Sequence, residues 1–113
     1  MPDQGDILLV PIPFTDLSSQ KRRPVIVISN NAYNHSSSDL VVVAMTSNPV
    51  EVDYSFTIVT SHLVKGTLNH PGKVRVDKIY AISKSIIVKT FGQVNEKVLE
   101  RIRKELNALT GGT

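Results

Sequence analysis

The sequence predicts a mostly β fold: a small, curved, largely antiparallel sheet or barrel closed by one amphipathic helix. Short apolar segments, several rich in Val and Ile, recur through residue 94 with turn residues between them. After residue 94 the apolar positions follow spacings of three and four, the period of a helix. With 113 residues, 41% hydrophobic and 20% charged, the chain has the composition of one folded domain, residues 1–113.

Several segments have the composition of strands. They are residues 6–12, 24–29, 40–47, 54–59, 73–83 and 85–94, with a loop expected at 35–39 and a turn at 69–73. Pro11 and Pro13 interrupt the first strand and predict an edge or a bulge there. The second and third segments, PVIVIS and LVVVAMTS, are almost continuously apolar, as in strands buried on both faces or in a small barrel. The last two segments predict a hairpin.

The C-terminal helix is expected to begin after Asn95, whose side chain is a good N-cap. Glu100 and Lys104 are placed to form an ion pair across one turn, and Gly111 follows as a C-terminal stop. The apolar face of the helix consists of Val98, Leu99, Ile102, Leu106 and Leu109.

Composition excludes several classes of site. The chain has no cysteine, so it offers no disulfide, zinc–thiolate site or cysteine nucleophile. The N-terminal MPDQGD lacks the basic and apolar regions of a signal peptide, and the longest apolar run, residues 40–45, is too short to cross a bilayer. We therefore expect a cytoplasmic protein without a membrane partner.

Positive charge is concentrated in one part of a mildly basic chain. The net charge is +3 and the pI about 9.3. Between residues 65 and 89 one acid, Asp77, stands among the cations Lys65, Lys73, Arg75, Lys78, Lys84 and Lys89. This excess predicts either attraction of a polyanion such as nucleic acid or a solvated, lysine-rich surface.

Lys21, Arg22 and Arg23 directly precede Pro24 and an apolar run. Proline restricts the residue before it, so Arg23 is expected in an extended conformation at the mouth of a strand. The planar guanidinium suits two parallel hydrogen bonds to a phosphate. The alternative is a solvated loop whose cations keep the surface soluble.

Two further places carry polar groups. Thr46 and Ser47 end the most apolar strand, and their hydroxyls either cap backbone groups or bind phosphate oxygens. In VRVD, residues 74–77, alternation along the strand puts Arg75 and Asp77 on one face, close enough to meet. They form either a surface ion pair or a cation and proton acceptor beside a reacting phosphate.

No metal or cofactor is expected. His35, His62 and His70 lie in loop-like stretches without the spacing of metal ligands, which predicts surface histidines. The sequence has no P-loop, dinucleotide-binding fingerprint, GxSxG elbow or HExxH motif.

These motifs together resemble one family. Residues 5–29, GDILLVPIPFTDLSSQKRRPVIVIS, resemble the opening of the PemK/MazF (Kid-like) toxins of bacterial type II toxin–antitoxin systems. VVVAMTSN (41–48) is similar to the family strand that ends in Thr-Ser, and VRVDKI (74–79) to its Arg-x-Asp strand. The likeness covers nearly the whole chain. It implies an SH3-like β-barrel of the MazF/CcdB type, with short peripheral helices besides the C-terminal one.

The resemblance also implies an activity and partners. Its members are mostly metal-independent, sequence-specific endoribonucleases (mRNA interferases) that cut single-stranded RNA in the groove of a homodimer. A cognate antitoxin protein silences them, and operator DNA is met only through the antitoxin complex. The expected reaction uses the 2′-hydroxyl of the RNA as nucleophile and leaves a 2′,3′-cyclic phosphate and a 5′-hydroxyl.

Roles carried over by the resemblance fall on the motifs above. Arg23 would stabilise the scissile phosphate, with Thr46 and Ser47 as its hydrogen-bonding partners, and Arg75 and Asp77 would be the acid/base pair. The expected auxiliary RNA contacts are Lys21, Arg22, Lys73 and Lys78.

Two other functions remain open. A catalytically silent module of the same fold could bind nucleic acid or protein without cutting. A CcdB-like gyrase inhibitor would depend on a tryptophan near the C-terminus, whereas this chain has no Trp and ends in TGGT.

Overall fold

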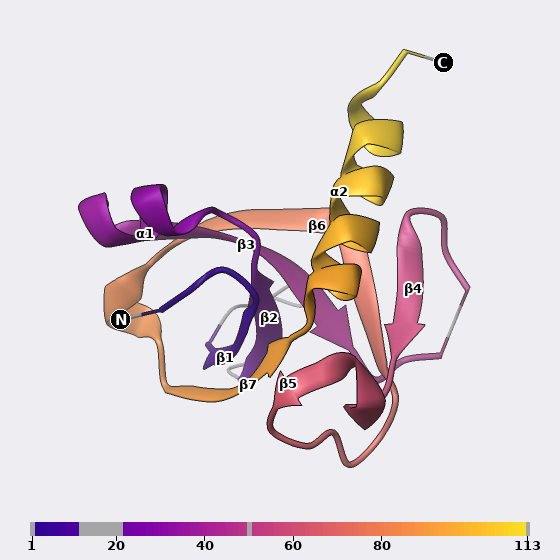
Figure 1. Cartoon of the computed structure of the whole chain (residues 1–113), viewed down its shortest axis with the longest axis horizontal. Coiled ribbons are helices and arrows are strands. Elements are labelled where there is room, and N and C mark those ends of the chain that lie inside the picture. Colours follow the sequence, from indigo (N-terminus) through magenta and orange to yellow (C-terminus); the bar gives the residue numbers. More distant parts are fainter. Residues whose placement is uncertain (1, 12–21, 50, 113) are drawn as a thin grey trace.

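The chain folds into one seven-stranded sheet that curls into a half-barrel (Figure 1). The computed structural model describes residues 2–11, 22–49 and 51–112. The strand order is β4-β6-β3-β2-β1-β7-β5, and each pair of neighbours is antiparallel. The strands are β1 (Asp6–Val10), β2 (Arg23–Val27), β3 (Asp39–Thr46), β4 (Ser55–Ile58), β5 (Leu63–Lys65), β6 (Gly72–Ser83) and β7 (Lys89–Val94). The predicted mostly β, barrel-like fold is confirmed.

Helical segments accompany the sheet. They are α1 (Asn31–Ser36), the 3-10 turns η1 (Thr60–His62) and η2 (Lys84–Ile86), and α2 (Glu96–Thr110). The start and end of α2 agree with prediction: the Asn95 side chain accepts a hydrogen bond from the backbone N–H of Val98 at 3.0 Å, and Gly111 follows the last turn. None of the helices in the described part of the chain has the length and apolar character needed to span a bilayer.

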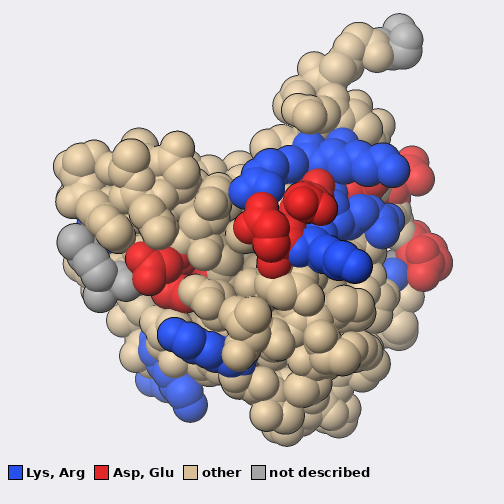
Figure 2. Space-filling model, in the orientation of Figure 1, with Lys and Arg blue, Asp and Glu red and all other residues tan. Residues whose placement is uncertain are grey.

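The polar face of α2 pairs differently from the prediction. Within the described residues Glu100 and Lys104 form no ion pair. Instead, Nε of Arg101 lies 3.8 Å from Oε1 of Glu105. Exposed pairs of this kind contribute little, so small differences in side-chain packing decide which one forms. On the face in Figure 2, basic and acidic groups are mixed beside α2. This face therefore presents no uniform positive field.

Apolar side chains are buried on both faces of the sheet. The cluster beneath α2 contains Ile7, Ile26, Val43, Met45, Ile58, Val74, Val76 and Val94, with Val98, Leu99 and Ile102 of the helix. The cluster on the opposite face contains Leu8, Val10, Val25, Val27, Leu40, Val42 and Ile82. Neighbours such as Val42 and Val43 enter different clusters because side chains alternate along a strand. This confirms that the continuous apolar runs are strands buried on both faces.

The predicted hairpin of the last two strands is wrong. β6 pairs with β3 and β4, whereas β7 pairs with β1 and β5. The chain between them passes through η2, and Ile86 and Ile87 pack against the cluster opposite α2. Burial of these two side chains leads the chain away from β6, so β7 joins the other half of the sheet.

Other departures are local. Pro11 does not mark an edge, because β1 lies between β2 and β7 and simply stops at Val10; Pro13 lies outside the described residues. The predicted loop at 35–39 overlaps the end of α1. α1 is a short peripheral helix of the kind that the family resemblance implies, although the residues themselves predicted no helix there. The edge strand β5 has no counterpart among the predicted elements. The helix is fixed by Asn34, which is fully buried and donates to the carbonyl of Ser29 at 2.8 Å.

The turn after β5 provides a test of the packing between β5 and β7. Gly66 has a φ of +88°, and a Cβ added there would lie 2.4 Å from the carbonyl oxygen of Phe91. Gly66→Ala should therefore lower the free energy of unfolding by about 1–3 kcal/mol, measured by urea denaturation. Gly112→Ala is the matched control, because nothing lies within 4 Å of its added Cβ. Equal midpoints for the two variants would contradict this account of the turn.

Candidate active site

Polar side chains form a row across the sheet where β2 begins and β3 ends. Thr46 lies opposite Lys73 in the β3–β6 ladder. The β2–β3 register pairs Val25 with Ala44, and continued by two residues it leads to Arg23 and Thr46. Adjacent strands lie about 4.8 Å apart. The backbones of Arg23, Thr46 and Lys73 are therefore neighbours on three successive strands.

Exposure differs among the residues at this end of the sheet. Arg23 is half-buried and its Nε atom is buried, whereas Arg22 and Ser47 are exposed. The hydroxyl oxygen of Thr46 accepts a hydrogen bond from the backbone N–H of Asn48 at 3.1 Å, so the predicted capping role is present. A hydroxyl that accepts can still donate its own proton. Thr46 is thus able to shape the turn and to contact a ligand.

An interruption of the β3–β6 ladder shapes the second part of the site. Residues 76–78 of β6 have no partner on β3, because the register moves from Val43–Ile79 directly to Ala44–Arg75. This is a bulge, which bends a strand and redirects its side chains. Val76 within it is fully buried beneath α2.

Arg75 and Asp77 form an ion pair with two hydrogen bonds. Arg75 donates from Nε to Oδ1 of Asp77 at 2.9 Å and from Nη2 to Oδ2 at 2.8 Å. The prediction that the two side chains meet is confirmed. The hydrogen bond from Arg75 lowers the pKa of Asp77, and the same bond raises the pKa of Arg75. Partial burial opposes both shifts without reversing them, so both groups are charged at neutral pH.

Tyr80 is a member of this group that sequence reasoning missed. It lies opposite Val42, two residues along β3 from Ala44, the partner of Arg75. Burial raises the pKa of the Tyr80 phenol, and the charges of Arg75 and Asp77 also act on it. A neutral hydroxyl therefore accompanies the ion pair. No sequence signal could have found it, because its closeness depends on the bulge.

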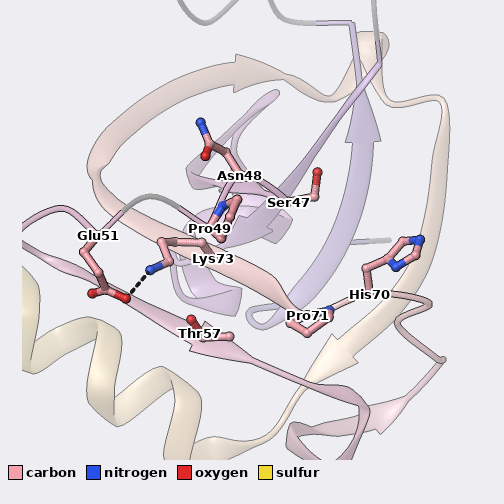
Figure 3. Close-up of a pocket in the computed structure, with 8 residues that line it drawn as sticks. All are labelled: Ser47, Asn48, Pro49, Glu51, Thr57, His70, Pro71 and Lys73. Carbon is pink, nitrogen blue, oxygen red and sulfur yellow. Dashed lines mark hydrogen bonds and ion pairs between the residues drawn. The ribbon is translucent and has the colours of Figure 1, made fainter.

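Lys73 lies in a pocket of about 520 Å³ beside this row (Figure 3). The side chain of Lys73 is 5% exposed, and its Nζ lies 3.1 Å from Oε1 of Glu51. In Figure 3 the two side chains point toward each other across the pocket wall. The residues that line the pocket are Ser47, Asn48, Pro49, Glu51, Thr57, His70, Pro71 and Lys73. Lys73, predicted as a surface RNA contact, is thus a buried residue that lines this pocket.

A smaller cavity of about 180 Å³ adjoins this pocket. It is lined by Pro24 and Thr46 among others, and it shares Ser47, His70 and Pro71 with the larger pocket. The two cavities therefore lie side by side, between the ends of β2 and β3 and Lys73.

The remaining predicted residues lie apart from these two cavities or cannot be placed. Lys78 is half-buried within the bulge and lines neither cavity, and Lys21 lies outside the described residues. The histidines belong to different surroundings: His62 accepts from the backbone N–H of Val59, and His35 lies 3.2 Å from Asp3. Among the described residues no three His, Cys, Asp or Glu side chains are grouped as metal ligands.

Comparison with known proteins identifies the family. The model of the PemK-like, MazF-like toxins of type II toxin–antitoxin systems matches residues 3–110, nearly the entire chain. A search of curated protein sequences gives no match.

Solved structures share the fold at low sequence identity. MazF from Deinococcus radiodurans is 23% identical with a TM-score of 0.76, covering 98% of this chain and 97% of that one. An endoribonuclease from Mycobacterial species is 23% identical with a TM-score of 0.74, covering 95% and 88%. Another mycobacterial endoribonuclease, in complex with its cognate antitoxin, is 22% identical with a TM-score of 0.71, covering 96% and 93%. The family match over residues 3–110 and the shared fold establish that this chain belongs to the PemK-like, MazF-like toxins of type II toxin–antitoxin systems.

Proposed function

We propose that this toxin is an endoribonuclease that cuts single-stranded RNA with its own side chains. The observation that carries the proposal is the placement of Arg23 and Thr46 on the same face of the sheet as the Arg75–Asp77 ion pair. The face thus offers a cation and hydroxyls for a phosphate next to a carboxylate that can accept a proton. Membership of the toxin family supports the proposal, as do the similar structures that are named endoribonucleases.

The proposed reaction is attack by the 2′-hydroxyl of the RNA on the adjacent phosphorus. The bond from O2′ to phosphorus forms and the bond from phosphorus to the 5′-oxygen breaks. Asp77 accepts the 2′-hydroxyl proton and solvent supplies the proton that the 5′-oxygen takes up. The upstream product carries a 2′,3′-cyclic phosphate and the downstream product a 5′-hydroxyl.

The charge states of Arg75 and Asp77 determine the role that each has in the proposed reaction. Asp77 is a weak base because Arg75 holds its pKa down. Arg75 retains its proton because its own pKa is raised, so it stabilises charge on the leaving oxygen without donating a proton. Most of the rate enhancement then depends on Arg23, Thr46 and Ser47, which would bind the phosphoryl oxygens as negative charge accumulates there.

The proposal includes partners. A homodimer would bring two such faces around one RNA strand, and Arg22, with Lys21 and Lys78, would add phosphate contacts. A cognate antitoxin would silence the toxin and link it to operator DNA; a similar mycobacterial endoribonuclease is known in complex with its cognate antitoxin. A silent binding module of the same fold remains the alternative, and cleavage assays separate the two.

The nucleophile can be tested with one modified substrate. Mapping of RNA ends first locates a cut site, and a 2′-deoxynucleotide is then placed 5′ of that scissile phosphate. We expect cutting to be abolished, because the nucleophile is missing, while binding changes by no more than about threefold. Cutting of the unmodified RNA should persist in EDTA. If the deoxy substrate is still cut, water is the nucleophile; if no RNA is cut, the binding module is the better description.

Substitution of Arg23 tests its role at the phosphate. Arg23→Lys keeps the charge but loses the planar pair of donors, so we expect kcat/KM to fall about 100-fold, nearly as far as with Arg23→Ala. Arg103→Lys, the same change on an exposed position of α2, is the control and should leave kcat/KM unchanged. Full activity of Arg23→Lys would reduce Arg23 to a general electrostatic contact.

Titration tests the state of Asp77. Its carboxyl should titrate below the ordinary value of 3.8, because Arg75 stabilises the charged form. The ion pair then stabilises the folded state fully at pH values above the pKa that Asp77 has in the unfolded chain. This stabilisation is lost as the pH falls through the lower pKa of Asp77 in the folded state. Carbon-detected NMR should show the Asp77 pKa rising in Arg75→Gln and unchanged in Arg103→Gln. An unchanged pKa in Arg75→Gln would show that the ion pair is absent in solution.

A further inference from the structure

Lys73 is a buried cation whose hydrogen-bonding capacity is largely unused. An ammonium has three N–H donors, yet in the part of the chain that the structure describes Nζ makes one hydrogen bond, to Glu51 at 3.1 Å. Burial of a charge with incomplete hydrogen bonding is costly. The pocket of about 520 Å³ next to it provides room for a ligand that would use the remaining donors.

We propose that this pocket binds a guanine base of the RNA, the base adjacent to the scissile phosphate. The inference rests on the proposed function for its biological setting, since it assumes that RNA is the ligand. It assigns to Glu51 and Lys73 the selection of one base, a role separate from the reaction at Arg23 and Asp77.

Charge favours a base over a phosphate in this pocket. The carboxylate of Glu51 neutralises the ammonium of Lys73 and would repel a phosphate placed beside it. A neutral, polar ligand with both donors and acceptors meets no such repulsion. The edge of a nucleobase is a ligand of this kind, and single-stranded RNA exposes these edges for recognition.

The pair of charges distinguishes between the four bases. The Watson–Crick edge of guanine presents two adjacent donors, N1–H and the 2-amino group, beside the acceptor O6. The two donors match the carboxylate of Glu51, and O6 matches the ammonium of Lys73. Adenine and cytosine offer only their amino group as a donor on this edge. Uracil flanks its single N–H with two carbonyl oxygens, which the carboxylate would repel.

The rest of the pocket suits a nucleotide held in this orientation. Pro49 and Pro71 contribute apolar surface for the plane of the base, and His70 lines the same pocket with its ring directed away from the Glu51–Lys73 pair (Figure 3). Ser47 borders both this pocket and the cavity lined by Thr46. A base in the larger pocket would therefore place its phosphate near the residues proposed for the reaction.

NMR titration of the full, 15N-labelled chain with nucleoside 5′-monophosphates tests the pocket independently of cleavage. The four ligands carry the same phosphate, so differences between them report the base. We expect millimolar GMP to shift the backbone amide signals of Ser47, Asn48, Thr57 and Lys73, with an affinity at least tenfold above that of AMP, CMP or UMP. IMP lacks the 2-amino group and should bind about fivefold more weakly than GMP, an intermediate loss.

Glu51→Gln is the decisive variant, because Gln keeps the size of this 92% exposed side chain and an oxygen that can accept from Lys73, and removes only the charge. It should reduce the affinity for GMP about tenfold and remove the preference for GMP over AMP. Glu100→Gln, an exposed change on α2, is the matched control and should retain both. Equal binding of GMP and AMP, shifts confined to other residues, absence of shifts with GMP, or an unaltered preference in Glu51→Gln would each overturn the proposal.

The outcomes for the pocket and for the reaction are distinguishable. If GMP binds selectively and no RNA is cut, the pocket assignment stands and the endoribonuclease proposal fails. If RNA is cut without guanine next to the cut, or with a guanine preference that Glu51→Gln retains, the reaction stands and the pocket assignment fails. If guanine flanks the cut in the wild type and Glu51→Gln cuts without that preference, both are supported.

Discussion

The bulge in β6 is the constraint on which the candidate site depends. The bulge leaves residues 76–78 outside the ladder with β3. On its N-terminal side, ordinary strand alternation buries Val76 beneath α2 and puts Arg75 and Asp77 on the other face. The same interruption brings Tyr80 near the ion pair. A regular β6 would continue the pairing with β3 without a break, and the strand would lack the bend that gathers these side chains. The bulge therefore determines which side chains of β6 lie together on the exposed face.

Each cation on the site face has its own electrostatic setting. Arg75 is bound by two hydrogen bonds to Asp77, and buried Lys73 is matched by the exposed carboxylate of Glu51. The positive excess of residues 65–89 is thus largely neutralised where it approaches the site. Local net charge alone therefore does not show how these two cations are paired.

Burial on both sheet faces explains how a small chain can fix such an arrangement. β2 and β3 supply side chains to both hydrophobic clusters. If either strand slipped by one residue, the side chains in one cluster would move to the opposite face of the sheet, and the reverse. This locks the ends of the strands, where Arg23 and Thr46 lie. The side chains that would act on a ligand are therefore carried by strand ends whose register is fixed by the core. Side chains on such strands are positioned more precisely than side chains on loops.

Local sequence patterns were sufficient to predict the strands with continuous apolar runs, the limits of α2 and the meeting of Arg75 with Asp77. These follow from local periodicity, from the N-cap at Asn95 and from alternation along one strand, none of which needs a distant contact. Four features could be recognised only in the folded sheet: the separation of β6 from β7, the bulge, the proximity of Tyr80 and the burial of Lys73. These features depend on which strands pair and on where Ile86 and Ile87 are buried. Both are contacts between residues far apart in the sequence, so they follow from the packing of the whole sheet and not from a local pattern.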